Sequence, residues 1–114
     1  MAINEQVDSK ELGGWRVHTG MSGIVDLPVE TDEEAIAPIK RFLSYLPSNH
    51  TQPPPRMSVP AGSGAHAERI LEVLPEPNNK VYDVRKVIEC IVDAGSLFEL
   101  KARFGRALLT GLAR

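Results

Sequence analysis

The sequence has one cysteine, Cys90, and few aromatic residues, which make up 5% of its 114 residues. A single cysteine excludes an internal disulfide and a CxxC metal site, so we expect Cys90 to be a small buried apolar residue in a reducing compartment. No apolar run approaches the roughly 20 residues that span a bilayer. The first residues carry neither the basic nor the apolar part of a secretory signal. We therefore expect a cytoplasmic protein without a membrane partner.

Positive charge is not in excess either. The 13 lysines and arginines are balanced by 15 aspartates and glutamates, for a net charge of −2, and the basic residues are scattered along the chain. Binding to a phosphate backbone needs a basic stripe or patch. Nucleic acid is therefore not an expected partner, and the composition is that of one modest globular domain, or of parts of two.

Prolines are concentrated in the middle of the chain. Seven of the nine lie between Pro47 and Pro77, among serines, asparagines and glycines, and residues 53–55 favour a stiff polyproline II stretch. A connecting segment of this length is unusual inside a compact domain, which indicates that its two ends belong to different domains or subdomains. We expect a first domain piece at 1–46, a connector at 47–80 with a short helix over 66–74, and a second domain piece at 81–114.

The first piece is expected to hold a strand followed by a capped helix. Residues 23–30, "GIVDLPVE", are β-branched and follow a glycine, which predicts a short strand. The Thr31 hydroxyl can accept from the backbone N–H of Glu34, whose carboxylate can accept from the N–H of Thr31. Pro38 lies inside this helix, where it removes one hydrogen bond and should bend the axis. The helix should end before Pro47. One of its faces is apolar and consists of Ala35, Ile36, Ile39, Phe42, Leu43 and Leu46.

The second piece is expected to hold a helix followed by two strands. Five apolar residues fall on one side of the stretch that ends at the helix stop Gly95: Val84, Val87, Ile88, Ile91 and Val92. "LFELKAR" then alternates as a strand, and the denser "RALLTGLAR" predicts a strand buried on both faces. A strand that reaches Arg114 is expected to have a hairpin or crossover to a further strand that pairs with it, and the sequence shows neither. The expected class is α/β: a strand–helix unit, a proline-rich connector, and a helix followed by two strands.

Four of the nine glycines lie within residues 13–23, which raises the question of a phosphate-binding loop. Gly13-Gly14 and Gly20-x-x-Gly23 could form an anion nest. Their spacing fits neither GxGxxG nor GxxxxGK[ST], and no expected strand precedes them. Turns and close backbone packing are the favoured interpretation.

The histidines offer two further hypotheses. His18 with Ser22 and Asp8 could form a nucleophilic triad, but the sequence has no nucleophile elbow and no oxyanion motif around them. His50 and His66 lie in the connector without partners at metal-ligand spacing, so solvated loop histidines are favoured. We expect no metal site.

The acidic run Asp32, Glu33 and Glu34 could be taken for catalytic carboxylates. Its position at a helix start explains it, since negative charge stabilises the positive end of the helix dipole. The residues alone therefore predict no catalytic constellation.

Two segments together resemble the carboxyltransferase (beta) subunit of biotin-dependent acyl-CoA carboxylases, which include propionyl-CoA carboxylase and the methylmalonyl-CoA carboxyltransferase 12S subunit. "KELGGWRVHTGMSGIVDLPVETDEEAIAPIKRFLSYLP" is similar to the end of that family's first crotonase-like domain. "YDVRKVIECIVDAGSLFELKARFGRALLTGLAR" is similar to the start of the second. The residues taken as the family signature, with structural roles, are Gly13, Gly14, His18, Ser22, Gly23, Tyr82, Asp83, Arg85, Gly111 and Arg114. Trp15 and Pro38 depart from the family pattern.

The resemblance implies a partial ClpP/crotonase-like fold. In the family, a carboxyl group passes from carboxybiotin to an acyl-CoA, and backbone N–H groups stabilise the enolate and ureido oxyanions. The glycine-rich segments that supply these donors lie outside the two matching segments. We therefore expect no catalytic residue and no bound cofactor here, with biotin on a separate carrier. The implied partners are the remaining parts of the subunit, the acyl-CoA and the biotin carrier, and a fragment of this kind should be inactive alone.

A different class of function stays open: a small non-catalytic α/β module that binds to or assembles with a larger carboxylase complex. A fragment should expose an apolar strand edge at residues 108–112 and aggregate or recruit a partner. A module should be monomeric and melt cooperatively. The two hypotheses therefore differ in the behaviour of the isolated chain.

Overall fold

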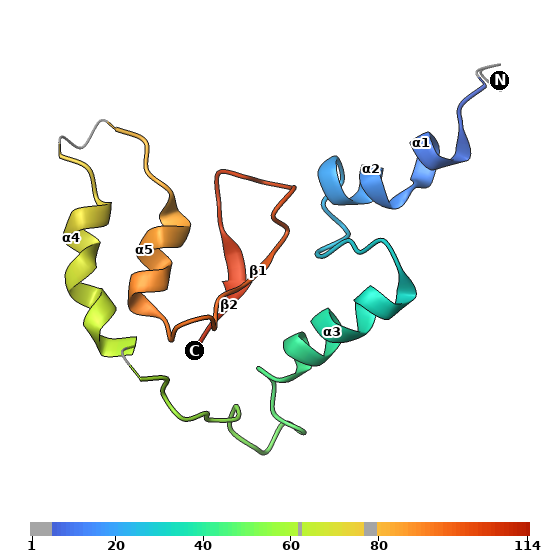
Figure 1. The fold of residues 1–114 in the computed structure, drawn as a ribbon. Helices are drawn as coiled ribbons and strands as arrows, with labels where there is room; N and C mark the ends of the chain where they lie inside the picture. Colours follow the sequence, from blue (N-terminus) through green and yellow to red (C-terminus); the bar gives the residue numbers. More distant parts are fainter. Residues whose placement is uncertain (1–5, 62, 77–79) are drawn as a thin grey trace.

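The computed structural model describes residues 6–61, 63–76 and 80–114. Its helices and strands are α1 (Ser9–Gly13), α2 (Trp15–Gly20), α3 (Asp32–Leu43), the 3-10 helix η1 (Ser63–Arg69), α4 (Ile70–Val73), α5 (Val84–Ile91), β1 (Phe98–Leu100) and β2 (Thr110–Leu112). Figure 1 shows the β1–β2 hairpin between α5 on one side and α2 and α3 on the other. The chain after α3 runs around the outside of this arrangement to α4.

The molecule is extended and has little interior of its own. Its radius of gyration is 19.1 Å, whereas a compact domain of this length would have about 13 Å. Among the described residues, the buried apolar side chains are Cys90 and Phe98, and the buried polar ones are Thr19 and Ser96. The chain therefore leaves much of its apolar surface exposed.

Helix α3 begins where the sequence predicts, with one change at its cap, but it ends at Leu43 rather than running to Leu46. The Thr31 hydroxyl accepts from the backbone N–H of Glu34 at 3.2 Å. The Glu34 carboxylate accepts from the N–H of Glu30, at 3.1 Å, rather than from that of Thr31. Pro38 lies inside the helix, as expected, and Lys40 and Arg41 place positive charge in its last turn.

The strand predicted over residues 23–30 is wrong, since this segment forms no strand. Its backbone makes separate bonds in place of a ladder: Val25 donates to the His18 carbonyl at 3.1 Å, and the Asp26 carbonyl accepts from Lys101 at 2.8 Å. Pro28 has no N–H to donate. The β-branched composition therefore reflects a partly buried position rather than strand pairing.

Helix α5 is confirmed, but it ends before the predicted stop. The Asp83 carboxylate caps it by accepting from the Arg85 N–H at 3.0 Å. Val92 is already extended, so the helix ends at Ile91. Gly95, with φ +71°, serves the turn that leads to β1, where the Ser96 N–H donates to the Asp93 carbonyl at 2.9 Å. The glycine is needed for this turn and not for the helix end.

The two predicted strands form an antiparallel hairpin. Phe98 lies opposite Leu112, Glu99 opposite Gly111 and Leu100 opposite Thr110. The prediction that the second strand is buried on both faces is wrong: Thr110 and Gly111 are exposed and Leu112 is half-buried. The sheet has two strands in the described structure, so β2 pairs with β1 on one edge and is open on the other. The expected α/β class holds only in part, and the described chain is mostly helical.

The connector contains the short helix that the sequence predicts. It begins as η1 and continues as α4, and both pack against α5. The side chain of His66 lies outside the described residues. Residues 51–60 are exposed and have no regular secondary structure. No helix within the described ranges has the length and apolar character needed to cross a membrane.

Candidate functional site

Residues 23–46 and residues 93–114 contact each other along the hairpin, and we call these contacts the seam. At one end of the seam, the Arg41 guanidinium donates to the carbonyls of Gly95 at 3.1 Å and Leu97 at 2.7 Å. The same guanidinium lies over the Phe98 ring, 5.0 Å from its centroid. Arg41 thus joins α3 to β1 through charge-assisted bonds and a cation–π contact.

Tyr45 adds a second link at this end. Its hydroxyl donates to the Ser96 carbonyl, and its ring stacks on Phe98 with centroids 6.3 Å apart and planes 11° apart. The Arg114 guanidinium lies 4.0 Å from the centroid of Tyr45 and donates to the Ser44 carbonyl at 2.5 Å. The aromatic pair is therefore covered by arginines from both halves of the chain.

Arg114 is itself fixed by its backbone. Its N–H donates to the Ser96 hydroxyl at 3.1 Å, and that hydroxyl donates to the Arg114 carbonyl at 3.1 Å. The Asp93 N–H donates to the same carbonyl at 2.6 Å. These bonds close the turn before β1 onto the end of β2, so the guanidinium is presented to α3 from an ordered backbone.

Lys101 anchors the other end of the seam. Its ammonium group pairs with the Asp26 carboxylate at 2.6 Å and donates to the Gly23 carbonyl. Lys101 has φ +55° and Gly23 has φ +67°, both in the left-handed region that glycine tolerates and other residues rarely adopt. A Cβ on Gly23 would overlap the Phe104 ring. Gly23 is therefore required both by its backbone angle and by close packing.

An apolar groove of about 360 Å³ runs between these two anchors. Its lining combines α3, the segment before it and β1: Asp26, Leu27, Val29, Ala35, Pro38, Ile39, Phe42, Leu43, Phe98 and Leu100. Ile39 and Leu43 are each 57% exposed. The groove is an uncovered apolar surface rather than a polar reaction site.

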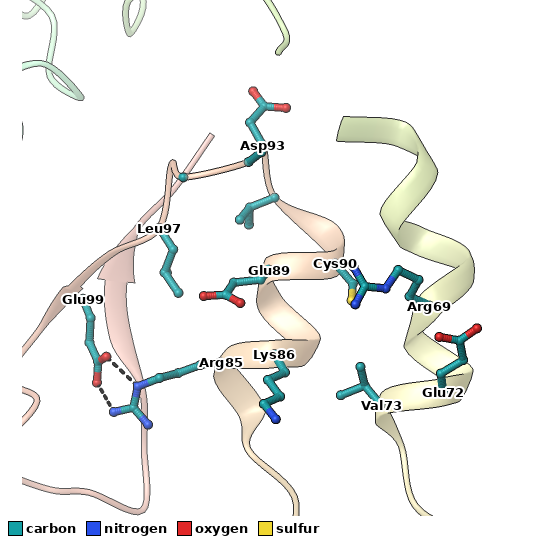
Figure 2. Close-up of a pocket in the computed structure, with 13 residues that line it drawn as sticks. Arg69, Glu72, Val73, Arg85, Lys86, Glu89, Cys90, Asp93, Leu97 and Glu99 are labelled. Carbon is teal, nitrogen blue, oxygen red and sulfur yellow. Dashed lines mark hydrogen bonds and ion pairs between the residues drawn. The ribbon is translucent and has the colours of Figure 1, made fainter. Parts of the chain in front are cut away.

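A second, larger groove of about 840 Å³ lies beside α5. Figure 2 shows Arg69 and Val73 reaching from η1 and α4 toward Cys90 and Lys86 of α5. Its lining carries both signs of charge. Among the described lining residues, Cys90 is the one nucleophile and is 7% exposed, and no histidine is present. The groove therefore offers binding groups but no nucleophile paired with a base.

The acid on β1 is already paired across this groove. The Arg85 guanidinium donates to the two carboxylate oxygens of Glu99, at 2.7 and 2.5 Å (Figure 2). Asp83 lies 3.5 Å from the same guanidinium. The hydrogen bond and charge of Glu99 raise the pKa of Arg85 above its usual range, so the Arg85 guanidinium stays charged at all ordinary pH values. Its role is to hold α5 against β1.

The histidine triad that the sequence disfavours is not assembled. His18 Nδ1 lies 3.1 Å from the Ser22 hydroxyl, but Asp8 caps α1 by accepting from the Lys10 N–H at 3.3 Å. His50 is exposed in a turn. No group of three histidines, cysteines or acidic residues suited to a metal occurs in the part of the chain that the structure describes.

The glycines serve turns and close packing, as favoured from the sequence. Gly13 ends α1, and Gly14 donates to the Lys10 carbonyl at 2.9 Å. A Cβ on Gly14 would overlap that carbonyl, and a Cβ on Gly111 would overlap the Phe98 carbonyl across the hairpin. The acidic run of residues 32–34 occupies the first turn of α3.

Sequence reasoning missed three residues that join the two halves: Arg41, Tyr45 and Lys101. Their acceptors are main-chain carbonyls 51 to 78 residues away. No local pattern encodes such partners. The one available signal was the position of Arg41 and Tyr45 four residues apart on an amphipathic helix, which is also typical of a solvated face.

Comparison with known proteins assigns this arrangement to a family. The Carboxyl transferase domain model matches residues 1–114. The chain is 40% identical to "Uncharacterized carboxylase YngE" of Bacillus subtilis, over all of this chain and 22% of that protein. It is 36% identical to the methylmalonyl-CoA carboxyltransferase 12S subunit of Propionibacterium freudenreichii, over 96% of this chain and 21% of the relative.

A solved structure agrees with these matches. The transcarboxylase 12S hexamer, with hydrolyzed methylmalonyl-coenzyme A bound, has a TM-score of 0.85 and 35% identity to this chain. The similarity covers 96% of this chain and 21% of that one. The chain thus spans about a fifth of the length of the relatives it matches.

Proposed function

The chain belongs to the carboxyl transferase domain family, and on that basis we propose that it works as a segment of an acyl-CoA carboxyltransferase subunit. The complete subunit would transfer a carboxyl group from carboxybiotin to an acyl-CoA. The observation that carries this proposal is the match over the whole chain to about a fifth of each relative. The segment alone would be inactive.

The exposed apolar surface supports a role inside a larger subunit. Ile36, Ile39 and Leu43 are each more than half exposed on α3, and Leu108 before β2 is 82% exposed. Contiguous apolar surface of this kind is costly in water and marks sites that other protein covers. The remaining crotonase-like parts of the subunit would supply that cover.

We assign residues 1–46 to the end of a first crotonase-like domain, 47–80 to the connector and 81–114 to the start of a second. The exposed, irregular stretch at 51–60 supports the placement of the connector. The seam joins the two pieces across it.

The family-signature residues would act through structure. Gly23 holds a turn, Arg85 forms an ion pair and Arg114 holds the seam. Asp83 caps α5. None of them is assigned a catalytic role, and biotin would be carried by a separate protein or domain. Carboxyl transfer would depend on backbone oxyanion donors and acyl-CoA contacts supplied by the rest of the subunit.

The seam also favours a second candidate function, a small binding or assembly module for a larger carboxylase complex. Bonds between residues more than 50 positions apart give the isolated chain a tertiary structure of its own. Such a module would be monomeric and would unfold in one cooperative transition. A chain that self-associates through its exposed apolar surface would favour the segment instead.

A chimaera tests the proposed function. We would replace the matching segment of the Propionibacterium 12S subunit with this chain and measure formation of methylmalonyl-CoA from carboxybiotin and propionyl-CoA. The expected result is retained transfer, because the segment supplies structure and the host supplies the oxyanion donors. A control chimaera with Phe98→Ala should lose activity together with its fold. A hexameric, folded chimaera without any transfer would contradict the proposal.

A further inference from the structure

The seam has the composition of a binding interface rather than of a chance contact. Arg41 and Tyr45, four residues apart, reach three consecutive carbonyls, those of Gly95, Ser96 and Leu97. We infer that this row of carbonyls, with the Phe98 ring beside it, is an acceptor site for the end of α3, and that residues 1–57 bind residues 58–114 through the seam without the connector.

The bonds that Arg41 and Tyr45 donate do not depend on side chains of the acceptor row. All the bonds from Arg41 and Tyr45 end on main-chain oxygens. The turn that presents these oxygens is held by Ser96 and Arg114, which bond each other at 3.1 Å. The acceptor row is therefore preorganised within the second half, and docking need not order it.

A second anchor fixes the orientation of the two halves. Lys101 joins the hairpin to Asp26 and Gly23 at the far end of the seam. Between the anchors, Phe42 of α3 faces the same apolar groove as Phe98 and Leu100 of β1. Two polar anchors with apolar contact between them define one register, as in specific protein interfaces.

The connector adds no comparable contact. Every residue from Thr51 to Pro60 is exposed. The helical part that follows, η1 and α4, packs on α5 and so belongs to the second half. The seam would bind in the same way whether or not the chain works as a carboxyltransferase segment.

Cleavage of the connector in the full chain tests this interface. A site-specific protease sequence inserted between Met57 and Ser58 allows the folded chain, with an affinity tag at its N-terminus, to be cut and then captured. Release of residues 58–114 from the captured tag is followed over time by mass spectrometry. We expect the second half to stay bound after cutting.

The variant Arg41→Met with Tyr45→Phe removes the donors but keeps the apolar bulk. It should release the second half about tenfold faster or more, which corresponds to about 1.4 kcal/mol. Lys101→Met, at the other anchor, should also speed release. The matched control is Arg85→Met, which removes an ion pair inside the second half and should leave release unchanged.

Two results would overturn the inference. Immediate separation of the wild-type halves would mean that the connector holds them together. Equal retention of the second half by the wild type and the double variant would mean that nonspecific association, and not the seam, retains it.

Discussion

Helices α3 and α5 have the same design but different surroundings. Each has an apolar face and a side-chain N-cap. Helix α5 buries Cys90 and half-buries Val87 and Ile88 beside η1, α4 and β1. Helix α3 has no buried residue, and Ile36 is 53% exposed. An amphipathic face predicts that a helix packs. In the described part of the chain α5 packs along its apolar face, whereas α3 has contacts mainly near its last turn.

Membership of a family whose proteins are about five times longer explains this difference. The relatives contain about four-fifths of their length outside the matched part. Helix α3 touches the rest of this chain mainly through its last turn and the residues after it, at Arg41, Ser44 and Tyr45. Under the proposed function, the rest of the subunit would cover its remaining apolar face.

The largest effect should come from Phe98, the buried ring on which α3 depends. Phe98→Ala removes the partner of Arg41 and Tyr45 and should lower the free energy of unfolding by about 3 kcal/mol or more. Urea denaturation followed by circular dichroism measures this loss. Phe104→Ala is the matched control, since Phe104 is 38% exposed and should cost less. Equal losses of free energy in the two variants would show that α3 does not depend on Phe98.

The comparison of the two helices is tested most sharply by a matched pair of substitutions. Ile88→Ala on α5 deletes half-buried side-chain volume and should cost about 2 kcal/mol. Ile36→Ala on α3 should cost less than about 0.5 kcal/mol, because the side chain is already in water. Both are read from the midpoint of urea unfolding. If Ile36→Ala cost as much as Ile88→Ala, α3 would not be the uncovered helix.

The caps should behave alike on both helices. Thr31→Ala and Asp83→Ala each remove one acceptor from a backbone N–H, at 3.2 and 3.0 Å. Each should lower the free energy of unfolding by about 1 kcal/mol, since capping is local and does not depend on what covers the helix. Thermal unfolding checks the pair. A cap effect on α5 alone would show that α3 does not form in the isolated chain.

The smallest effect is expected at the Arg85–Glu99 pair on α5. Glu99→Gln should weaken the chain slightly, and the difference from the wild type should shrink as salt is added, because exposed ion pairs are screened. Because the pKa of Arg85 is raised in the folded chain, the stabilisation by its charge is fully present below the usual arginine pKa. That stabilisation is lost only as the pH rises past the raised pKa. Both pKa values lie far above neutral pH, so the contribution of the Arg85 charge should be constant between about pH 6 and pH 9. Salt and pH titrations of the unfolding midpoint measure both points.

The sequence predicted those features that depend on neighbours along the chain. The caps at Thr31 and Asp83, the apolar periodicity of α3 and α5, and the two strands of the hairpin all arise from residues a few positions apart. Turn chemistry likewise identified the glycines at 13–23 as residues of turns and close packing, and a Cβ on Gly14 or Gly23 would overlap a neighbour.

Features that depend on distant partners could not be predicted in this way. Residues 23–30 have strand composition, but a strand needs a neighbouring strand, which this segment lacks in the described chain. The burial expected for β2 needs a covering layer on each face of the strand, and the described sheet has only two strands. The seam joins Arg41 and Lys101 to carbonyls more than 50 residues away, and no periodicity records such a pairing.

The account is tested most directly by carboxyl transfer with the purified 114-residue chain. The chain is mixed with carboxybiotin and propionyl-CoA, and methylmalonyl-CoA is measured by mass spectrometry against a sample without protein. We predict no product above that background, because under the proposed function the oxyanion donors and acyl-CoA contacts come from the rest of the subunit. Protein-dependent formation of methylmalonyl-CoA by this chain alone would contradict the account.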